Sequence, residues 1–272
     1  MNSTALHALH KAIQNPERAA LRLLLKARIA RTPLRKARYR LLGTISKAWN
    51  VDAWEYLREY RASAYTRWCR QRLLELGEAT GNWRMGTSGA FHSEALYVLV
   101  RAARPATVVE TGVLYGTSSG HILAALEANG TGRLHSIDLG NSPGEPPHDF
   151  MVRPEFLHRW DYIEGDSRDE LPRLLQRVEA IDMFHHDSLH TFEHMTGEFE
   201  TVLPYVAPGG VIASHDVFVS DSLKRIWRQN AFPTFCRRHS LRHLMIRNSG
   251  IARVRRRASS RSVPATPSLV VA

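Results

Sequence analysis

The sequence predicts an α/β protein built on a doubly wound, mostly parallel sheet of seven strands, preceded by an N-terminal helical section. Two observations carry this prediction. From residue 93 onward, short β-branched runs alternate with segments of helical periodicity, and a hairpin pattern ends the regular part of the chain. Strands that alternate with helices indicate βαβ units and a parallel sheet. The hairpin adds an antiparallel edge to that sheet.

The first 90 residues are predicted to be helical. Leu6, Leu9 and Ile13 recur at helical spacing, and leucines continue the pattern towards residue 30. Lys and Arg interleave with these leucines, which is typical of a helix on a membrane surface and equally of a helix packed against a neighbour. Residues 45–78 continue the helical pattern with many aromatic side chains, and the glycine-rich stretch 80–90 is predicted to be a loop.

Strands and helices then alternate along the chain. The predicted strands are residues 107–110, 133–138, 162–164, 181–186 and 211–214. The predicted helices are residues 93–103, 118–128, 168–177, 191–203 and 221–229. Residues 241–247 and 251–257 flank Asn248, Ser249 and Gly250 and are predicted to form the hairpin. We therefore expect a helical section 1–90 that serves as a lid or an oligomer contact, a ligand-binding domain 91–257 and a disordered basic tail 258–272.

The composition excludes several classes of protein. Apolar residues make up 43% of the chain and charged residues 23%, a balance that allows a sizeable core and excludes a largely disordered protein. The two cysteines, Cys69 and Cys236, cannot build a disulfide framework, so we predict a reducing, cytoplasmic location. No apolar run approaches the roughly 18 to 20 residues of a membrane-spanning helix, and we see no secretory signal.

The net charge of +11 is concentrated at the two ends of the sequence. Residues 17–40 carry a net +8 and residues 237–272 a net +9, so the rest of the chain is acidic. An acidic centre argues against a nucleic-acid partner that is drawn into an active site. The basic ends are interpreted as solvated faces, or as surfaces for anionic lipid or an acidic partner. A basic helix near the N-terminus would then give peripheral membrane contact.

Glycine and polar residues follow the first three predicted strands, at the edge where open α/β sheets bind ligands. The turn after the first strand contains Gly112, Tyr115, Gly116 and Ser118. Glycine lets the backbone approach a ligand closely, and the next helix points free N–H groups into that space. Asp138, 26 residues beyond Gly112, suits the two hydroxyls of a ribose. Asp166 and Ser167 follow the third strand and are placed to meet a base edge.

The turn also discriminates between nucleoside cofactors. It reads E-x-G-x-x-x-G from Glu110, and the G-x-G-x-x-G pattern of dinucleotide sites is absent. A carboxylate at its start repels a pyrophosphate and suits a ligand that carries a cationic ammonium or sulfonium group. The alternative is that these are turn glycines and a surface aspartate without a ligand.

These stretches together resemble class I S-adenosylmethionine-dependent methyltransferases. More narrowly, they resemble the branch with macrocin-type and mycinamicin-type sugar O-methyltransferases and cephalosporin-biosynthesis methyltransferase homologues. The similarity lies in residues 109–118, 136–138, 165–167, 187–192 and 208–216. The resemblance covers roughly residues 91–257 and implies a Rossmann-like fold with S-adenosylmethionine as cofactor. The binding residues that follow are Glu110, Gly112, Tyr115, Gly116, Ser118, Asp138, Asp166, Ser167 and Asp187.

A divalent metal site is predicted beside the cofactor. Asp187 ends the fourth strand and Asp216 the fifth, and adjacent parallel strands lie about 4.8 Å apart, so the two carboxylates can share an ion. Two carboxylates suit Mg²⁺, which members of the resembled branch bind in this way. They often carry two acids where this chain has His215 and Asp216. Imidazole favours transition metals, so Mn²⁺, another metal or a His215 that faces away stay open. The predicted ligands are Asp187, His215 and Asp216.

His190 is the candidate catalytic base. A histidine of near-neutral pKa suits proton removal from a hydroxyl, and the matching histidine of the resembled branch acts as the base. Residues 186–190 also resemble the H-E-x-x-H motif of zinc peptidases with Asp for Glu, but His186 falls at a strand end, whereas that motif needs one helix. His185 and His194 are interpreted as polar residues near a strand end.

The sequence therefore predicts a metal-assisted O-methyltransferase that acts on a hydroxyl of a sugar or glycosylated small molecule and forms a homo-oligomer. The alternatives are a metal-independent small-molecule methyltransferase and a non-catalytic, cofactor-binding scaffold at a membrane surface. An RNA methyltransferase is disfavoured by the acidic centre of the chain. Acceptor specificity is expected from residues 45–92 and 139–160.

Overall fold

The computed structural model describes residues 32–80, 90–217 and 230–254, and residue 20. Several predicted segments lie outside these residues. They are most of the basic helix 3–30, most of the loop 80–90, the helix 221–229 and the tail 258–272. Within the described part of the chain, no helix is both long enough and apolar enough to cross a membrane.

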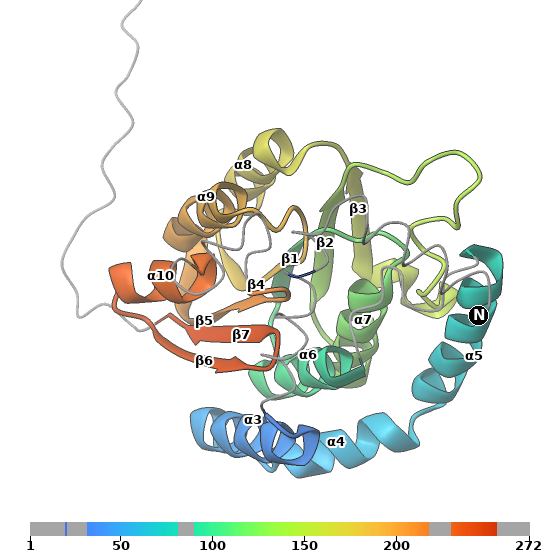
Figure 1. Ribbon diagram of the computed structural model, residues 1–272, viewed down its shortest axis with the longest axis horizontal. Coiled ribbons are helices and arrows are strands. Elements are labelled where there is room, and N and C mark those ends of the chain that lie inside the picture. Colours follow the sequence, from blue (N-terminus) through green and yellow to red (C-terminus); the bar gives the residue numbers. More distant parts are fainter. Residues whose placement is uncertain (1–19, 21–31, 81–89, 218–229, 255–272) are drawn as a thin grey trace, which may run out of the picture.

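The first three helices of the described residues form an arc around one side of the sheet (Figure 1). They are α3 (Leu34–Trp49), α4 (Ala53–Ala62) and α5 (Ala64–Thr80). Asp52 begins α4 because its side chain accepts a hydrogen bond from the Trp54 N–H at 3.0 Å. Their buried side chains belong to the same hydrophobic cluster as side chains of the sheet. The helical section thus shares its core with the rest of the protein.

The sheet has seven strands in the order β3-β2-β1-β4-β5-β7-β6. The strands are β1 (Thr107–Thr111), β2 (Arg133–Asp138), β3 (Trp160–Glu164), β4 (Ile181–His186), β5 (Val206–Ser214), β6 (Arg242–Ile246) and β7 (Ser249–Arg253). The first five are parallel, and β7 pairs antiparallel with both β5 and β6. The predicted fold class, with its C-terminal antiparallel hairpin, is confirmed.

Helices cover both faces of this sheet (Figure 1). One face packs against α6 (Ala90–Ala103) and α7 (Thr117–Asn129). The other packs against α8 (Ser167–Val178), α9 (Phe192–Val202) and α10 (Ala231–Arg238). Side chains alternate between faces along a strand. Val108 accordingly lies in the cluster with α6 and α7, and Val109 lies in the cluster with α8 and α9.

The hairpin differs from its prediction in one respect. Its turn lies at residues 247–248, so that Ser249 and Gly250 belong to β7 instead of to the turn. Gly250 pairs with Ser214 and Met245, and a Cβ there would lie 2.5 Å from the ring of Phe232. The glycine is thus explained by the close approach of α10, a helix that the sequence reading missed.

Candidate functional site

A cavity of about 690 Å³ opens at the carboxyl ends of the parallel strands. Its size is typical of a small-molecule or cofactor site. Most of the predicted site residues line it, namely Gly112, Ser118, Asp138, Asp166, Ser167, Asp187, His190, His215 and Asp216. The structure therefore brings together in one cavity the residues that follow β1, β2, β3, β4 and β5.

Gly112 joins the loops that follow β1 and β4. Its φ is +86°, and a Cβ there would lie 2.3 Å from the backbone oxygen of Asp187. Its N–H donates to the Ile137 oxygen at 2.9 Å. Only glycine allows this approach, because any side chain would push the two loops apart.

We expect Gly112→Ala to abolish tight cofactor binding and to lower stability. The left-handed φ alone costs roughly 1–2 kcal/mol for alanine, and the contact with Asp187 adds to this cost. Gly130→Ala is the matched control, since Gly130 also has a positive φ, of +69°, but has open space where its Cβ would lie. Thermal unfolding and ligand titration of both variants would separate the effects. Equal loss of ligand affinity in both would contradict this assignment.

Asp138 shapes the turn that it faces. One carboxylate oxygen accepts from the N–H groups of Val113 at 2.6 Å and Leu114 at 3.1 Å, and the other accepts from Gly140 at 2.9 Å. A carboxylate has about four acceptor sites, so Asp138 can still accept from a ligand in the cavity. Leu139, which follows it, is 74% exposed and also lines the cavity.

Asp166 and Ser167 stand at the start of α8. The Asp166 side chain accepts from the Arg168 N–H at 2.9 Å and pairs with the Arg168 guanidinium at 2.5 Å. These hydrogen bonds lower the pKa of Asp166 to about 2. Arg168 and the exposed Leu189 also line the cavity, and the sequence reading missed both. The only indication in the sequence that Leu189 belongs to the site was its place between Asp187 and His190, which were both predicted to be functional.

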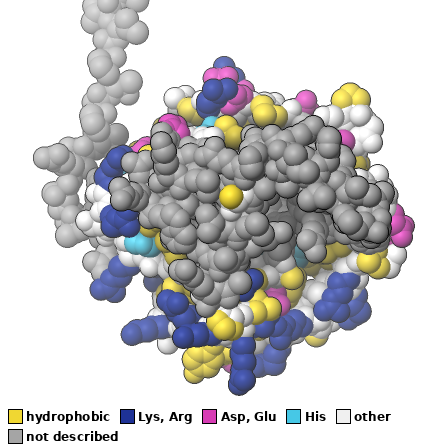
Figure 2. Space-filling model, in the orientation of Figure 1, with side chains coloured by type: hydrophobic (Ala, Val, Ile, Leu, Met, Phe, Trp, Pro, Cys, Tyr) yellow, Lys and Arg dark blue, Asp and Glu magenta, His cyan; other side chains and the backbone are white. Residues whose placement is uncertain are grey.

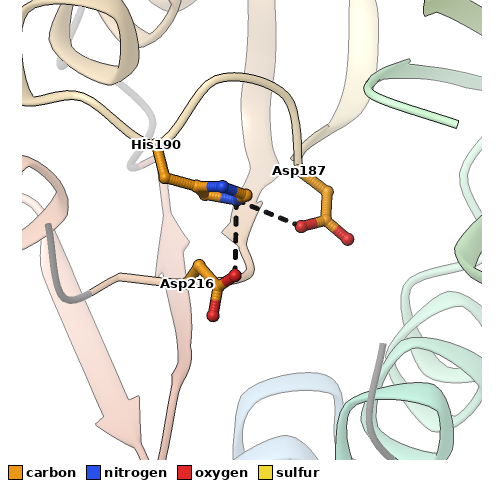
Figure 3. A group of neighbouring side chains, drawn as sticks. All are labelled: Asp187, His190 and Asp216. Atoms are coloured by element: carbon orange, nitrogen blue, oxygen red, sulfur yellow. Dashed lines mark hydrogen bonds and ion pairs between the residues drawn. The ribbon is translucent and has the colours of Figure 1, made fainter. Parts of the chain in front are cut away.

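Asp187, His190 and Asp216 form a cluster at the ends of β4 and β5, with both carboxylates near the His190 imidazole (Figure 3). His190 Nε2 lies 3.2 Å from Asp187 Oδ1 and 3.7 Å from Asp216 Oδ2. One ligand atom of each residue lies within 4.8 Å of the others. Two carboxylates with one imidazole fit a divalent cation. Among the described residues, His190 rather than His215 completes this group.

His215 nevertheless lies against the same carboxylates. Its Nδ1 is 3.1 Å from Asp187 Oδ1 and 3.7 Å from Asp216 Oδ2. Burial opposes protonation, but the attraction of Asp187 and Asp216 outweighs it and raises the pKa of His215 to about 9. The same carboxylates raise the pKa of His190 against burial. Burial would raise the pKa of Asp187, but His215 and His190 hold it well below its ordinary value.

Three predicted cofactor residues do not line the cavity. Glu110 is fully buried on the α6 and α7 side of the sheet, where Ser119, Ser136 and His185 contact its carboxylate. It therefore does not present a charge to the cavity, contrary to our reading of the turn. Tyr115 is 1% exposed and packs in the core. Gly116 is the N-cap residue of α7.

The sequence reading also missed Glu198, a buried residue of α9. Its carboxylate accepts from His186 at 2.7 Å, from His194 at 2.8 Å and from three hydroxyls at 2.6 to 2.9 Å. The three hydroxyls belong to Thr111, Ser167 and Ser188. Burial would raise the pKa of Glu198, but these hydrogen bonds, led by those from the histidines, hold it far below its usual value of 4.5. Glu198 thus connects β1, β4 and α8 beneath the cavity.

Glu198→Gln should lower the free energy of unfolding by about 3 kcal/mol near neutral pH, because it breaks a buried, hydrogen-bonded charge network. A carboxylate with a depressed pKa stabilises the fold above its unfolded-state pKa, and this stabilisation is lost as the pH falls below that value. The penalty should therefore stay constant from about pH 7 to about pH 5 and shrink as the pH falls further towards about pH 3 in urea unfolding. Glu200 lies on the same helix as Glu198 and forms a half-exposed ion pair with Arg238 of α10. Glu200→Gln should cost about 0–1 kcal/mol. A pH-independent penalty for Glu198→Gln would contradict this role.

Known proteins are similar to this chain in part of its sequence and in its fold. Residues 109–217 match a family described as a methyltransferase domain. No curated protein matches the sequence. The O-methyltransferase TomG from Streptomyces achromogenes, solved with S-adenosylmethionine, has a TM-score of 0.53 at 20% identity, covering 69% of this chain and 89% of that chain. An O-methyltransferase from Bacillus cereus, solved with SAH, has a TM-score of 0.50 at 17% identity, covering 68% and 91%.

The magnesium-containing MycE structure from the mycinamycin pathway is less similar. Its TM-score is 0.47 at 16% identity, and the match covers 57% of that chain. The narrower sugar-acting branch stays a prediction. Residues 109–217 are similar to the methyltransferase domain family, and the chain shares the fold of the solved O-methyltransferases.

Proposed function

We propose that the protein transfers a methyl group from S-adenosylmethionine to a hydroxyl of a small molecule, most specifically of a sugar or glycosylated compound. One observation carries this proposal. A single cavity holds Asp138, with acceptor capacity to spare, together with the cluster of Asp187, His190 and Asp216. A ribose-binding carboxylate and a proton-accepting histidine in one cavity suit methyl transfer to oxygen.

The cavity fits the nucleoside part of the cofactor. Asp138 is placed to accept from ribose hydroxyls, and the exposed Leu139 beside it offers an apolar surface for a base. Ser118 and Gly112 line the part of the wall that follows β1. S-adenosylmethionine supplies an electrophilic methyl group on a sulfonium, and the remaining thioether leaves uncharged.

His190 acts on the acceptor in this proposal. As the hydroxyl oxygen forms its new bond to the methyl carbon, the proton of that hydroxyl passes to His190 Nδ1, because Nε2 already donates its own proton to Asp187. Asp187 and Asp216 stabilise the resulting imidazolium, in keeping with the raised pKa of His190. Holding the two reactants in line in one cavity would supply much of the acceleration.

A divalent cation, Mg²⁺ or Mn²⁺, would be held by the carboxylates of Asp187 and Asp216 with His215 or His190 beside them. It would polarise an acceptor hydroxyl and lower its pKa. The metal-independent alternative also has an observation in its favour. His215, with a pKa of about 9, already places a cationic group against both carboxylates.

Mn²⁺ titration followed by electron paramagnetic resonance distinguishes the two forms of the proposal. We expect the wild type to bind Mn²⁺ and Asp216→Asn to bind it at least about tenfold more weakly, because even the loss of a residue that only orients a metal ligand weakens binding by about 10–100-fold. Asparagine tolerates the positive φ of residue 216, +44°, so the variant should fold. Asp166→Asn, also in the cavity wall but outside the cluster, is the control. No Mn²⁺ or Mg²⁺ binding by a protein that binds cofactor would favour the metal-independent form.

The first test is calorimetry with S-adenosylmethionine, followed by transfer of its labelled methyl group to a panel of glycosides, catechols and other hydroxylated compounds. Micromolar binding and label transfer to glycosides would support the full proposal. Transfer to other hydroxyl compounds alone would keep the O-methyltransferase and exclude the sugar. Binding without label transfer to any compound would favour the non-catalytic, cofactor-binding scaffold, and the absence of binding by folded protein would contradict the methyltransferase proposal.

The helical section also bears on a membrane role. Exposed Lys and Arg of α3 and α4 gather along the lower edge of the molecule in Figure 2. They are Arg35, Lys36, Arg40, Lys47, Arg58 and Arg61. Such a surface supports peripheral contact with anionic lipid, and pelleting with anionic but not neutral vesicles would test it. The lid role of this section and a homo-oligomer stay predictions.

A further inference from the structure

The two histidines at the end of β4 enter different surroundings because side chains alternate along a strand. His186 lies on the α9 side, where it bonds Glu198. His185 lies on the α6 side, where its neighbours across the sheet are Glu110 of β1 and Ala213 of β5. Both histidines are fully buried. The proposed reaction uses neither of them.

His185 is the centre of a buried chain of hydrogen bonds. Ser249 Oγ lies 2.8 Å from His92 Nδ1, and His92 Nε2 lies 3.0 Å from His185 Nε2. His185 Nδ1 in turn lies 3.2 Å from Glu110 Oε1. The chain therefore runs from β7 through α6 and β4 to β1, beneath the cavity, and both ring nitrogens of each histidine have a partner.

The donors at the Glu110 end set the direction of this chain. Glu110 Oε2 accepts from the hydroxyls of Ser119 at 2.6 Å and Ser136 at 2.8 Å. Glu110 is therefore an acceptor, and His185 must donate from Nδ1. A neutral His185 accepts at Nε2, so His92 donates from Nε2 and accepts from the Ser249 hydroxyl at Nδ1.

The ring of His92 also contacts the cavity residue His215. The two ring centroids lie 4.4 Å apart with 45° between the planes. The χ2 torsion of histidine is broad and has no sharp preference of its own, so a neighbour must fix the ring plane. That plane decides whether His215 Nδ1 faces Asp187, 3.1 Å away.

We propose that His92 is a positioning residue that fixes the ring of His215 beside Asp187, and that Glu110 holds His92 in place through His185. This gives Glu110 a role in the site without contact to a ligand. This proposal rests on the proposed function only in the role that His215 then plays in the reaction. The ring geometry itself can be tested without any substrate.

The experiment is imidazole nitrogen NMR on protein with isotope-labelled histidine, in the wild type and three variants. His92→Phe keeps an aromatic ring but cannot hydrogen-bond. His92→Gln keeps the hydrogen bonds, because its amide can donate to His185 and accept from Ser249, but it has no ring to pack against His215. His121→Phe is the matched control, since His121 is also fully buried but bonds Tyr60 and Thr117 instead.

In the wild type we expect His185 as the Nδ1–H tautomer and His92 as the Nε2–H tautomer. The His215 signals should shift by more than their line width in His92→Phe, whose ring has no hydrogen bonds to hold it, shift as well in His92→Gln, which has no ring, and stay unchanged in His121→Phe. Unchanged His215 signals in His92→Phe, an equal shift in His121→Phe or an Nε2–H tautomer at His185 would each overturn the proposal. Calorimetry on the same samples measures S-adenosylmethionine binding independently of the NMR signals. Absence of binding would contradict the proposed function, whereas the NMR result alone decides whether His92 positions the ring of His215.

Discussion

Asp138→Ala is expected to weaken S-adenosylmethionine binding by about 100-fold or more. Hydrogen bonds to a charged group contribute about 1.5–3 kcal/mol each, and 1.4 kcal/mol corresponds to a factor of ten in affinity. The variant would lose the acceptor for the ribose hydroxyls. It would also free the N–H groups of Val113 and Leu114, which Asp138 holds in the turn after β1. Calorimetry with the purified variant measures the loss.

The two contributions can be separated within this chain. Asp138→Asn keeps one carbonyl oxygen for the turn and removes the charge, so its affinity should fall between those of wild type and Asp138→Ala. Asp182→Ala is the matched control. Asp182 also accepts from two backbone N–H groups, those of Ala106 at 2.8 Å and Thr107 at 3.0 Å, but at the opposite end of β1. The Asp182→Ala variant should lose stability and keep its affinity for S-adenosylmethionine. If the affinity of Asp138→Ala stayed within about threefold of wild type, the lost free energy would be smaller than that of one hydrogen bond to a charged group. Another residue would then hold the ribose.

The regular part of the fold was predictable because its signals are local. β2 and β4 have the predicted bounds, and each ends in a polar residue at the edge of the sheet. β5 begins at Val206, five residues earlier than predicted. Pro208, Gly209 and Gly210 read as a turn, yet they continue the strand next to an irregularity in its pairing with β4. Tertiary pairing outweighed local turn chemistry there.

The place of Glu110 shows why strand ends are ambiguous in a sequence. The strand continues to Thr111, so residue 110 still alternates with its neighbours and shares the side of Val108. Gly112, the first residue after the strand, is also the first residue of this segment that reaches the cavity wall. Strict alternation from the apolar Val108 would have placed Glu110 in the interior. The charge of Glu110 suggested contact with a ligand, whereas its position in the strand indicated burial. The position was the correct guide.

The supporting residues of the site could not be predicted because their contacts join distant elements. His92 lies 93 residues from His185 in the sequence, and Glu198 lies 87 residues from Thr111. Each is a polar residue on a helix, where a single sequence gives no reason to prefer a buried network over a solvated face. By contrast, Asp187, His190 and Asp216 follow adjacent strands, so sheet topology alone brought them together.

His190→Ala is expected to lower kcat by about 10²–10⁴-fold with the acceptor found in the screen, the range attributed to general acid–base catalysis. S-adenosylmethionine affinity should change little, because His190 lies at the β4–β5 side of the cavity, in contact with Asp187 and Asp216. His158→Ala is the control, since that side chain is 56% exposed on the surface and pairs with Glu127. A variant that loses cofactor affinity in proportion to kcat would contradict the assignment as base.

Mn²⁺ affinity of the same His190 variant distinguishes the two roles that the geometry allows. Nε2 of His190 faces the two carboxylates, and a neutral imidazole whose Nε2 lone pair binds a cation carries its proton on Nδ1, so it cannot also accept the proton of the acceptor. If His190 is the base, Mn²⁺ binding survives its removal while turnover is lost. If His190 is a ligand, both fall together, and the proton must pass to another group. His215, whose Nδ1 contacts the same Asp187 oxygen, is then the remaining histidine at the cluster, and His215→Ala would show the loss of kcat instead.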